Sequence, residues 1–315
     1  MTLQQLAYFV AVADVRSFTR AAESLGVAQP TLSRQLKALE GELGASLVDR
    51  GGRDGPVLTP AGEAVLPFAR RMLADMSSAR GAVAEIVGLR SGRVRIGATP
   101  SLCIGVLADV LRVFHEQHPD IRLELVENGS QPLVRDLVRG EIDVALVIVP
   151  AAGIDPALHS TPLLRERLSV ASPSSSRAPS TRGSMTVREL ARRPLVVPRQ
   201  GYDLREVTLR AYAEAGVTPK FAVEGGEMDS VLRLVEAGTG VAVVPDLVFA
   251  GRPRLRRTVL TPPMYRTVGL ARRADLAPSH AVRAFRDTLL GFLADLSAAG
   301  GFPGDVQVLR RPDAT

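Results

Sequence analysis

The chain has 315 residues, of which 46% are hydrophobic, with one cysteine and a formal net charge of +6. Such a length allows two or three domains with cores of their own, and the longest apolar runs are too short to span a bilayer. The single Cys103 excludes an intramolecular disulfide and a zinc site built from cysteines. Residues 1–15 lack the pattern of a secretory signal, so we expect a cytoplasmic protein.

The first two helices are predicted within residues 3–25. The first covers Leu3–Val15, and its apolar stripe consists of Leu6, Phe9, Val10 and Ala13. Ser17 or Thr19 can cap the second helix by accepting a hydrogen bond from a free backbone N–H. The inner face of the second helix consists of Ala21, Ala22 and Leu25. Gly26 stands where a helix-ending residue needs a positive φ.

A third helix follows, with Pro30 in its first turn, where no N–H is missed. Its apolar face consists of Leu32, Leu36, Leu39 and Leu43. Polar side chains must then face outward, as in the recognition helix of a helix-turn-helix, over residues 18–37. The candidate DNA contacts on this helix are Gln29, Pro30, Thr31, Ser33, Arg34 and Lys37. The alternative is a helical hairpin with a solvated polar face, and bulk charge does not favour DNA, since residues 1–90 hold ten Lys and Arg against nine Asp and Glu.

The segment LGASLVDRGGRDGPVLTPAGE, residues 43–63, predicts a glycine-rich hairpin beside that helix. Arg50 and Arg53 lie in it, and an arginine at the tip of such a wing can enter the minor groove. Read together, residues 1–63 closely resemble the N-terminal domain of LysR-type transcriptional regulators. Val48 and Asp49 depart from the Phe-Glu pair that is common in the family.

A long amphipathic helix is predicted over residues 60–90, with Thr59 as its N-cap and Pro60 in its first position. Its apolar positions alternate in steps of four and three, and they are Val65, Ala69, Met72, Met76, Ala79, Val83 and Ile86. This heptad pattern predicts a dimerisation helix. The alternative is a helix packed on its own domain. The motif RSGR at 90–93 is then a hinge.

From residue 93 the pattern alternates between strands and helices, which predicts a parallel sheet. Strands are expected at VRIGAT, IRLELVE, IDVALVIV, PLVVP, KFAVE, GVAVVP and YRTVGLA, and helices at 104–118, 130–140, 204–215, 228–237 and 278–296. The stretch 172–184 is polar and predicts a loop. This half resembles the two-lobed, periplasmic-binding-protein-like effector domain of the same family. The expected division is 1–59 for the winged helix-turn-helix, 60–90 for the linker helix, 91–300 for the effector domain and 301–315 for a tail. The first lobe would comprise about 93–164 and 265–297, and the second about 165–264.

In such folds a ligand binds at the carboxyl ends of strands, between the lobes. The candidate effector-binding residues are Thr99, Pro100, Ser101, Gly129 and Ser130 from the first lobe, and Arg199, Tyr202 and Met228 from the second. Helix N-termini and hydroxyls suit an anion or carboxylate, and Arg205 is a further cation. The alternative is that these hydroxyls only cap helices.

The other motifs in the sequence give little support for a catalytic or metal site. The HxxH pair His115 and His118 lacks a completing ligand, GTG at 238–240 lacks Rossmann spacing, and no GxSxG or Walker loop occurs. No catalytic, metal or cofactor site is therefore expected. Cys103 is either a redox sensor or, more commonly, a packing thiol.

The sequence predicts a transcriptional regulator that binds double-stranded DNA and responds to a small-molecule effector. The resemblance implies a dimer of dimers and contact with RNA polymerase, with no membrane association. The alternatives are a solute-binding module without a transcriptional role and an enzyme.

Overall fold

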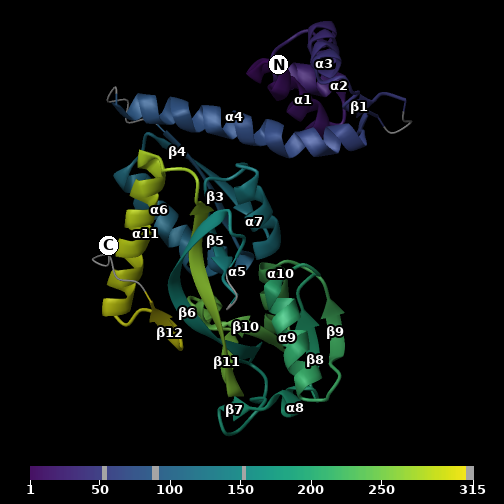
Figure 1. The fold of residues 1–315 in the computed structure, drawn as a ribbon. Coiled ribbons are helices and arrows are strands. Elements are labelled where there is room, and N and C mark those ends of the chain that lie inside the picture. The colour runs from purple at the N-terminus through teal and green to yellow at the C-terminus, as the bar shows by residue number, and fades with distance from the viewer. Residues whose placement is uncertain (52–54, 87–91, 151–153, 310–315) are drawn as a thin grey trace. The chain divides into compact units, whose positions relative to one another are not determined.

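The computed structural model describes residues 1–51, 55–86, 92–150 and 154–309. The chain divides into two units (Figure 1), one formed by Met1–Leu89 with Val138–Glu141 and the other by Arg90–Leu137 with Ile142–Thr315. No helix in the described part of the chain is long and apolar enough to cross a membrane.

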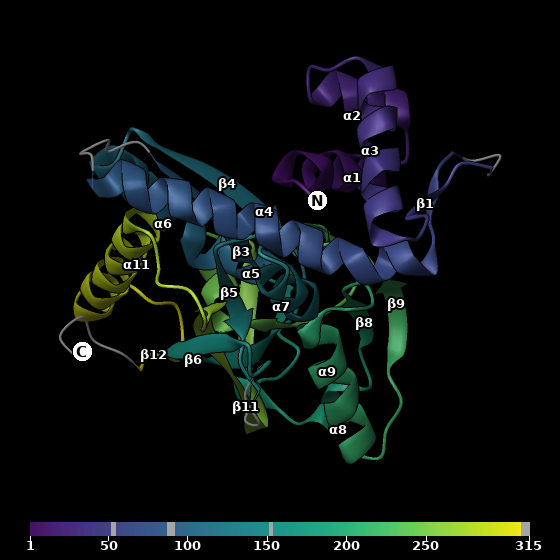
Figure 2. The ribbon, with the colours of Figure 1, turned by 45° about the horizontal axis from the view of Figure 1, so that its top comes forward.

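The first unit is mainly helical. Its elements are α1 (Leu3–Val15), α2 (Phe18–Ser24), α3 (Gln29–Leu43), β1 (Val48–Asp49), β2 (Val57–Leu58) and α4 (Pro60–Ile86). The predicted bounds of the first helix are confirmed, and Ser17 is the cap of α2, because its hydroxyl accepts a hydrogen bond from Arg20 N at 3.3 Å. Gly26 has the expected positive φ of 64°. Figure 2 shows α1, α2 and α3 beside the hairpin that begins with β1.

The inner faces of these helices differ in part from the predicted ones. The buried face of α1 consists of Gln5, Leu6, Tyr8, Phe9 and Val12, whereas Val10 and Ala13 are only half-buried. Leu25 is 38% exposed and Leu43 is 40% exposed, so both were wrongly assigned to an inner face. Each stands at the C-terminal end of its helix, beyond the main packing surface.

The long helix α4 begins as predicted. The Thr59 hydroxyl accepts a hydrogen bond from Gly62 N at 3.0 Å, which satisfies one N–H of the first turn. Gly62 lies so close to the loop before β1 that a Cβ would stand 2.1 Å from Leu47 O. The helix is described as far as Ile86, so residues 87–90 and the first half of the predicted RSGR hinge lie outside the described residues.

The second unit is built on a twisted sheet of mixed direction. Its main path runs β10–β6–β11–β5–β3–β4, formed by Ala242–Pro245, Leu158–Pro173, Leu255–Arg273, Val144–Ile148, Gly92–Ala98 and Ile121–Glu127. β3 is parallel to β4 and β5, but β6, β10 and β11 pair antiparallel. The prediction of a parallel sheet was therefore right for β3–β5 and wrong for β10 and β11, which pair antiparallel with β6 and β5. β8 (Pro194–Val197) and β9 (Lys220–Glu224) form a separate parallel pair.

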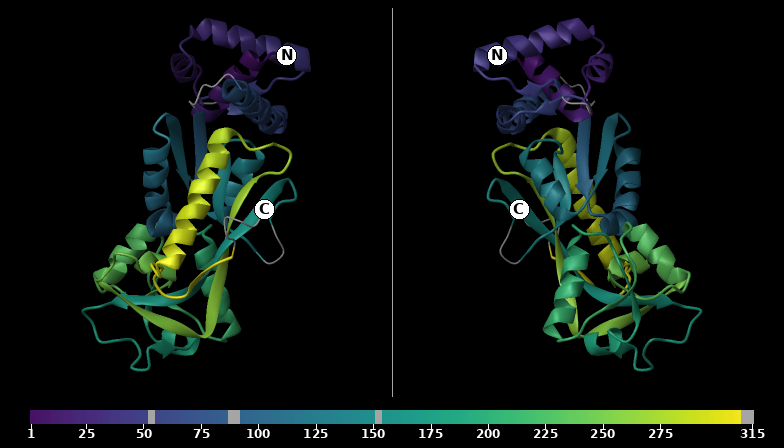
Figure 3. Two further views of the ribbon diagram at one scale, coloured as in Figure 1. Left: turned by 90° about the vertical axis from the view of Figure 1, so that its left-hand side faces the viewer. Right: turned by 90° about the vertical axis from the view of Figure 1, so that its right-hand side faces the viewer.

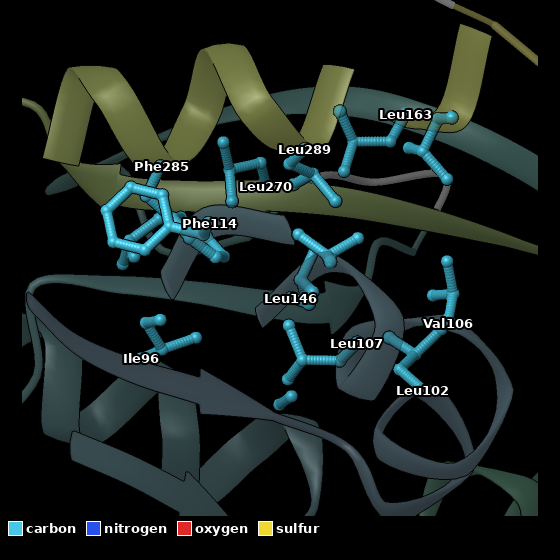
Figure 4. Close-up of a cluster of buried hydrophobic side chains, with 14 of the residues drawn as sticks. Ile96, Leu102, Val106, Leu107, Phe114, Leu146, Leu163, Leu270, Phe285 and Leu289 are labelled. Atoms are coloured by element: carbon cyan, nitrogen blue, oxygen red, sulfur yellow. The ribbon is translucent and has the colours of Figure 1, made fainter. Parts of the chain in front are cut away.

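Two hydrophobic cores lie along β6 and β11. In the first, Leu164 and Val268 pack with other residues of the sheet, including Ile96 and Leu146, which Figure 4 labels, and with residues of flanking helices. Those helices are α5 (Pro100–Leu102), a π-turn over Cys103–Leu107, α6 (Ala108–Gln117) and α11 (His280–Ala298), which is yellow in Figure 3. On the opposite face of the sheet, α7 (Ser130–Val138) covers Gly97 with Leu133.

The second core contains Leu168 from β6 and Leu255 from β11. The other elements of this half are β7 (Ser184–Met185), α8 (Val187–Leu190), α9 (Asp203–Glu214), α10 (Met228–Glu236) and a 3-10 turn over Asp246–Phe249. β6 and β11 thus contribute side chains to both cores, and we call the two parts lobe 1 and lobe 2.

The described part of the predicted tail is ordered against the sheet. β12 (Val306–Val308) pairs antiparallel with β6. Asp305 N donates a hydrogen bond to the buried Asp246 carboxylate at 2.8 Å. Gly304 has a φ of 74°, and a Cβ there would lie 2.2 Å from that carboxylate, so only glycine fits.

Candidate functional site

The outward face of α3 carries the predicted recognition side chains. Leu32, Leu36 and Leu39 are fully buried, and they fix the rotation of the helix about its axis. The polar residues of the predicted set lie on its other sides: Gln29, Pro30, Arg34 and Lys37 are exposed, and Thr31 and Ser33 are half-buried. The helix therefore presents amide, hydroxyl and cationic donors on one continuous surface, as base and phosphate recognition requires.

Arg50 does not extend from the wing as the sequence suggested. Its guanidinium donates to the Ser33 hydroxyl at 3.2 Å and to the Glu40 carboxylate at 3.3 Å, and it lies 5.0 Å from the centre of the Phe18 ring. These contacts fold it over α2 and α3. Arg53 lies outside the described residues.

Glu40 is a residue that the sequence analysis missed. One of its carboxylate oxygens accepts hydrogen bonds from Leu47 N at 2.9 Å and Val48 N at 3.2 Å, and the other oxygen binds Arg50. One carboxylate therefore joins the recognition helix to the start of the wing. The sequence around Glu40 does not indicate this role, since an acidic residue on a helix is ordinarily solvated.

The predicted seam of α4 divides between two environments. Ala69 is 1% exposed and packs in the core of the first unit, with Val65 half-buried beside it, so Ala69 cannot contact a second protomer. Met72 and Val83 are 41% and 59% exposed, and Phe68, which the prediction omitted, is 65% exposed. Met76 is half-buried and Ala79 exposed, whereas the side chain of Ile86 lies outside the described residues. Phe68, Met72, Ala79 and Val83 form one apolar stripe on the surface of α4, because they recur in steps of four and seven.

In lobe 1, the carboxyl ends of β3 and β4 bring two of the predicted segments together. Asn128 N donates to Ala98 O at 3.2 Å, so residues 99–101 and 128–130 begin side by side. Thr99, Pro100, Ser101, Gly129 and Ser130 are all buried. The Thr99 hydroxyl has no hydrogen-bond partner. A buried hydroxyl left unpaired costs about 1–3 kcal/mol, so the Thr99 hydroxyl can gain a hydrogen bond from a polar group that enters this region.

The two serines have partners of their own. The Ser130 hydroxyl accepts a hydrogen bond from Ile148 N at 3.0 Å, which ties α7 to β5, so the alternative that this hydroxyl only caps a helix is wrong. The Ser101 hydroxyl accepts a hydrogen bond from Arg266 at 2.9 Å. Arg266 also binds the fully buried Glu166 at 2.7 Å. Burial raises the pKa of the Glu166 carboxyl, and the Arg266 cation opposes that rise.

From lobe 2, some of the predicted residues reach this region and others do not. Arg199 donates to Glu227 at 2.8 Å and to Asn128 of lobe 1 at 3.3 Å, and its guanidinium lies over the Tyr202 ring. Met228 is 1% exposed and packs in the lobe 2 core, so it is not a wall of the site. Arg205 is bound to Glu224 and to Pro198 O, which makes it a structural cation.

A winged helix-turn-helix joined to a two-lobed α/β unit defines a ligand-responsive, DNA-binding regulator. The model for the bacterial regulatory helix-turn-helix proteins of the lysR family matches residues 3–63, and the LysR substrate-binding domain matches residues 88–294. The chain belongs to the LysR family of transcriptional regulators. It is thus a DNA-binding regulator with an effector-binding domain, and neither an enzyme nor a solute-binding module without a transcriptional role.

The chain is similar to several known regulators. It is 32% identical over 251 residues to the HTH-type transcriptional regulator BenM of Acinetobacter baylyi, covering 78% of this chain and 80% of BenM. A full-length variant of OxyR from Pseudomonas aeruginosa is 26% identical, with a TM-score of 0.71 over 92% of this chain and 94% of that one. Full-length CbnR in complex with its target DNA is also 26% identical, with a TM-score of 0.64 over 93% of this chain and 100% of CbnR.

Proposed function

We propose that residues 29–37 of this regulator read DNA in the major groove and that a small organic acid, held between lobe 1 and lobe 2, modulates that binding. The observation that carries the proposal is the buried, unpartnered Thr99 hydroxyl at the carboxyl end of β3 in lobe 1. The proposed division of the chain is the one given by the sequence: 1–59, 60–90, 91–300 and a short tail.

The DNA-binding part rests on the exposure of α3. Arg34 and Lys37 stand clear of the leucine face, and Gln29 and Thr31 lie in the first turn, which enters the groove in helix-turn-helix proteins. Ser33, held by Arg50, contributes a hydroxyl between them. Arg50 reaches DNA only if it leaves Ser33 and Glu40, and we place Arg53 at the wing on sequence alone.

The effector part rests on the chemistry around Thr99. An unpaired hydroxyl, the Arg266 guanidinium at Ser101 and the N-terminus of α7 all favour an acceptor-rich, negatively charged group. Arg199 and Tyr202 face the same region from lobe 2. A carboxylate satisfies these groups, whereas a neutral amide supplies only one acceptor oxygen.

The apolar stripe of α4 supports self-association. Phe68, Met72 and Val83 expose apolar surface that a second copy of the helix would cover. We propose a dimer along α4, with two dimers forming a tetramer that bends or grips DNA, contacts RNA polymerase and acts in the cytoplasm.

The DNA test is to sequence genomic fragments retained by the purified protein, with and without cell extract. We expect a small set of sites with two-fold symmetric halves. Retention of random fragments, with no shared sequence, would contradict specific recognition.

The effector test is a thermal-shift titration of the full-length protein against organic acids and their matched neutral amides. An acid that stabilises the wild type should lose its effect with Thr99→Val and keep it with Thr218→Val, which removes an exposed hydroxyl in lobe 2. Equal stabilisation by acids and amides would rule out the carboxylate class.

A further inference from the structure

The backbones of the two lobes approach each other closely at Gly129 and Gly201. A Cβ built on Gly129 would lie 2.4 Å from Gly201 O, so the lobe 1 segment 128–130 and the lobe 2 segment 199–203 are in direct contact. Gly201 has a φ of 86°, which turns the chain toward α9 directly after this contact. α9 therefore begins close to the start of α7.

Asp203 contributes a side chain to the contact between the lobes. It is the first residue of α9, and its carboxylate accepts a hydrogen bond from Ser130 N, the first N–H of α7, at 3.3 Å. The N-terminal N–H groups of a helix have no partners within the helix and carry a partial positive charge. A carboxylate from lobe 2 thus occupies the anion-binding end of a lobe 1 helix.

The neighbouring cation is engaged in the same contact. Arg199 binds Glu227 of its own lobe and also donates to the Asn128 side chain, whose oxygen in turn accepts from Gly129 N at 2.9 Å. Two polar contacts therefore cross between the lobes here, one from Arg199 and one to Asp203. Both involve residues within three positions of the start of α7.

We propose that Asp203 is an internal competitor for the effector: its carboxylate stands where the carboxylate of the bound acid would stand, and it holds the lobes together at α7 until the acid replaces it. The inference rests on the proposed carboxylate effector. It adds that the Asp203 carboxylate occupies the site when no effector is bound. Exchange of one carboxylate for another at Ser130 N breaks a contact between the lobes. Binding of the acid thereby changes the contacts between lobe 1 and lobe 2.

The test uses hydrogen–deuterium exchange of the full-length protein in the absence of DNA and effector, followed in peptides covering residues 129–138. In Asp203→Ala the exchange of the first α7 amides should rise about fivefold to tenfold, the loss expected for one long, partly buried hydrogen bond. Adding sodium acetate should restore protection in Asp203→Ala, because acetate can enter the vacated carboxylate position. Acetamide and sodium chloride at equal concentration should not.

Glu206→Ala is the matched control, because Glu206 lies exposed in the same first turn of α9 and carries the same charge. It should leave exchange in α7 unchanged. Asp203→Asn, which keeps the size and one acceptor oxygen, should lose less protection than Asp203→Ala and show no acetate effect. Unaltered exchange in Asp203→Ala, or rescue by acetamide as complete as by acetate, would overturn the proposal. These exchange measurements need no effector. A failure of the organic-acid titration would therefore contradict the proposed effector class without affecting their result.

Discussion

Arg50 donates a hydrogen bond to the hydroxyl of Ser33 at 3.2 Å, across 17 positions of sequence and from the wing to the recognition helix. With Glu40 binding both Arg50 and the backbone before β1, the wing and α3 are fastened through side chains as well as through the chain itself. The proposed DNA-binding surface is therefore preorganised, because the position of the wing follows that of the helix.

Arg34→Ala should weaken operator binding by about 1–3 kcal/mol if the side chain reads a base edge, and the loss should fall on specific sites more than on random DNA. Binding should be measured by fluorescence anisotropy at one fixed salt concentration, since phosphate contacts depend on salt. Arg122→Ala, at an arginine of β4 that is 77% exposed, is the control for removal of one positive charge. Wild-type affinity in Arg34→Ala would show that α3 docks in another way.

Met72→Asp should dissociate the dimer, because it would bury an uncompensated charge in the apolar stripe of α4 at a cost of several kcal/mol. Ser77→Asp places the same charge on an exposed position about 140° away around the helix axis and should leave the dimer intact. Sedimentation velocity distinguishes the two. A dimer that survives in Met72→Asp would place the interface on a different surface.

Cys103 should be inert toward hydrogen peroxide. Burial, together with the nearby Glu127 carboxylate, raises the pKa of its thiol to about 12, so only about one thiol in ten thousand is the reactive thiolate at pH 8. Operator binding of the wild type and of Cys103→Ser should be equal before and after peroxide treatment. A loss of binding confined to the wild type would identify the thiol as a sensor.

Asp305→Asn should destabilise the folded protein by about 1 kcal/mol at neutral pH, since the carboxylate binds the Tyr265 hydroxyl at 2.8 Å and Arg167 at 2.7 Å in a partly exposed position. The Tyr265 hydrogen bond, followed by the Arg167 cation, lowers the pKa of Asp305 in the folded state. Its contribution is therefore present above the unfolded pKa of about 3.9 and lost as the pH falls through the lower folded value.

Urea denaturation across a pH series measures this difference. The gap between wild type and Asp305→Asn should close in acid. Asp287→Asn, at an aspartate that is 61% exposed, serves as the control with no expected gap. A gap that persists unchanged at the lowest pH would show that the loss is not one of charge.

The sequence predicted those elements in which apolar residues recur regularly on one face. The leucines at 32, 36 and 39 gave the rotation of α3. The strands β4 and β9 have the predicted limits. β6 was missed, because its centre reads Arg-Glu-Arg at 165–167 and looks solvated. Two of those charges pair with residues far along the chain: Glu166 binds Arg266, and Arg167 binds Asp305. The local sequence pattern does not predict such pairs.

The candidate site shows the same division. The sequence pointed to residues 99–101 and 128–130, because each follows a strand and precedes a helix, and the structure brings them together. It could not show that Ser130 would be used to tie β5, or that Met228 would turn into the lobe 2 core. Asp203 went unnoticed, because its partner is a backbone N–H 73 positions earlier.

The continuity of β6 and β11 has a consequence for dissecting the protein. Each strand supplies both hydrophobic cores, from Leu164 to Leu168 in one and from Leu255 to Val268 in the other. A gene fragment encoding lobe 2 alone would begin and end in the middle of these strands and expose two severed edges to aggregation. Limited proteolysis should accordingly release no stable single lobe, and chimaeras that exchange ligand specificity between relatives should transplant the two lobes as one piece.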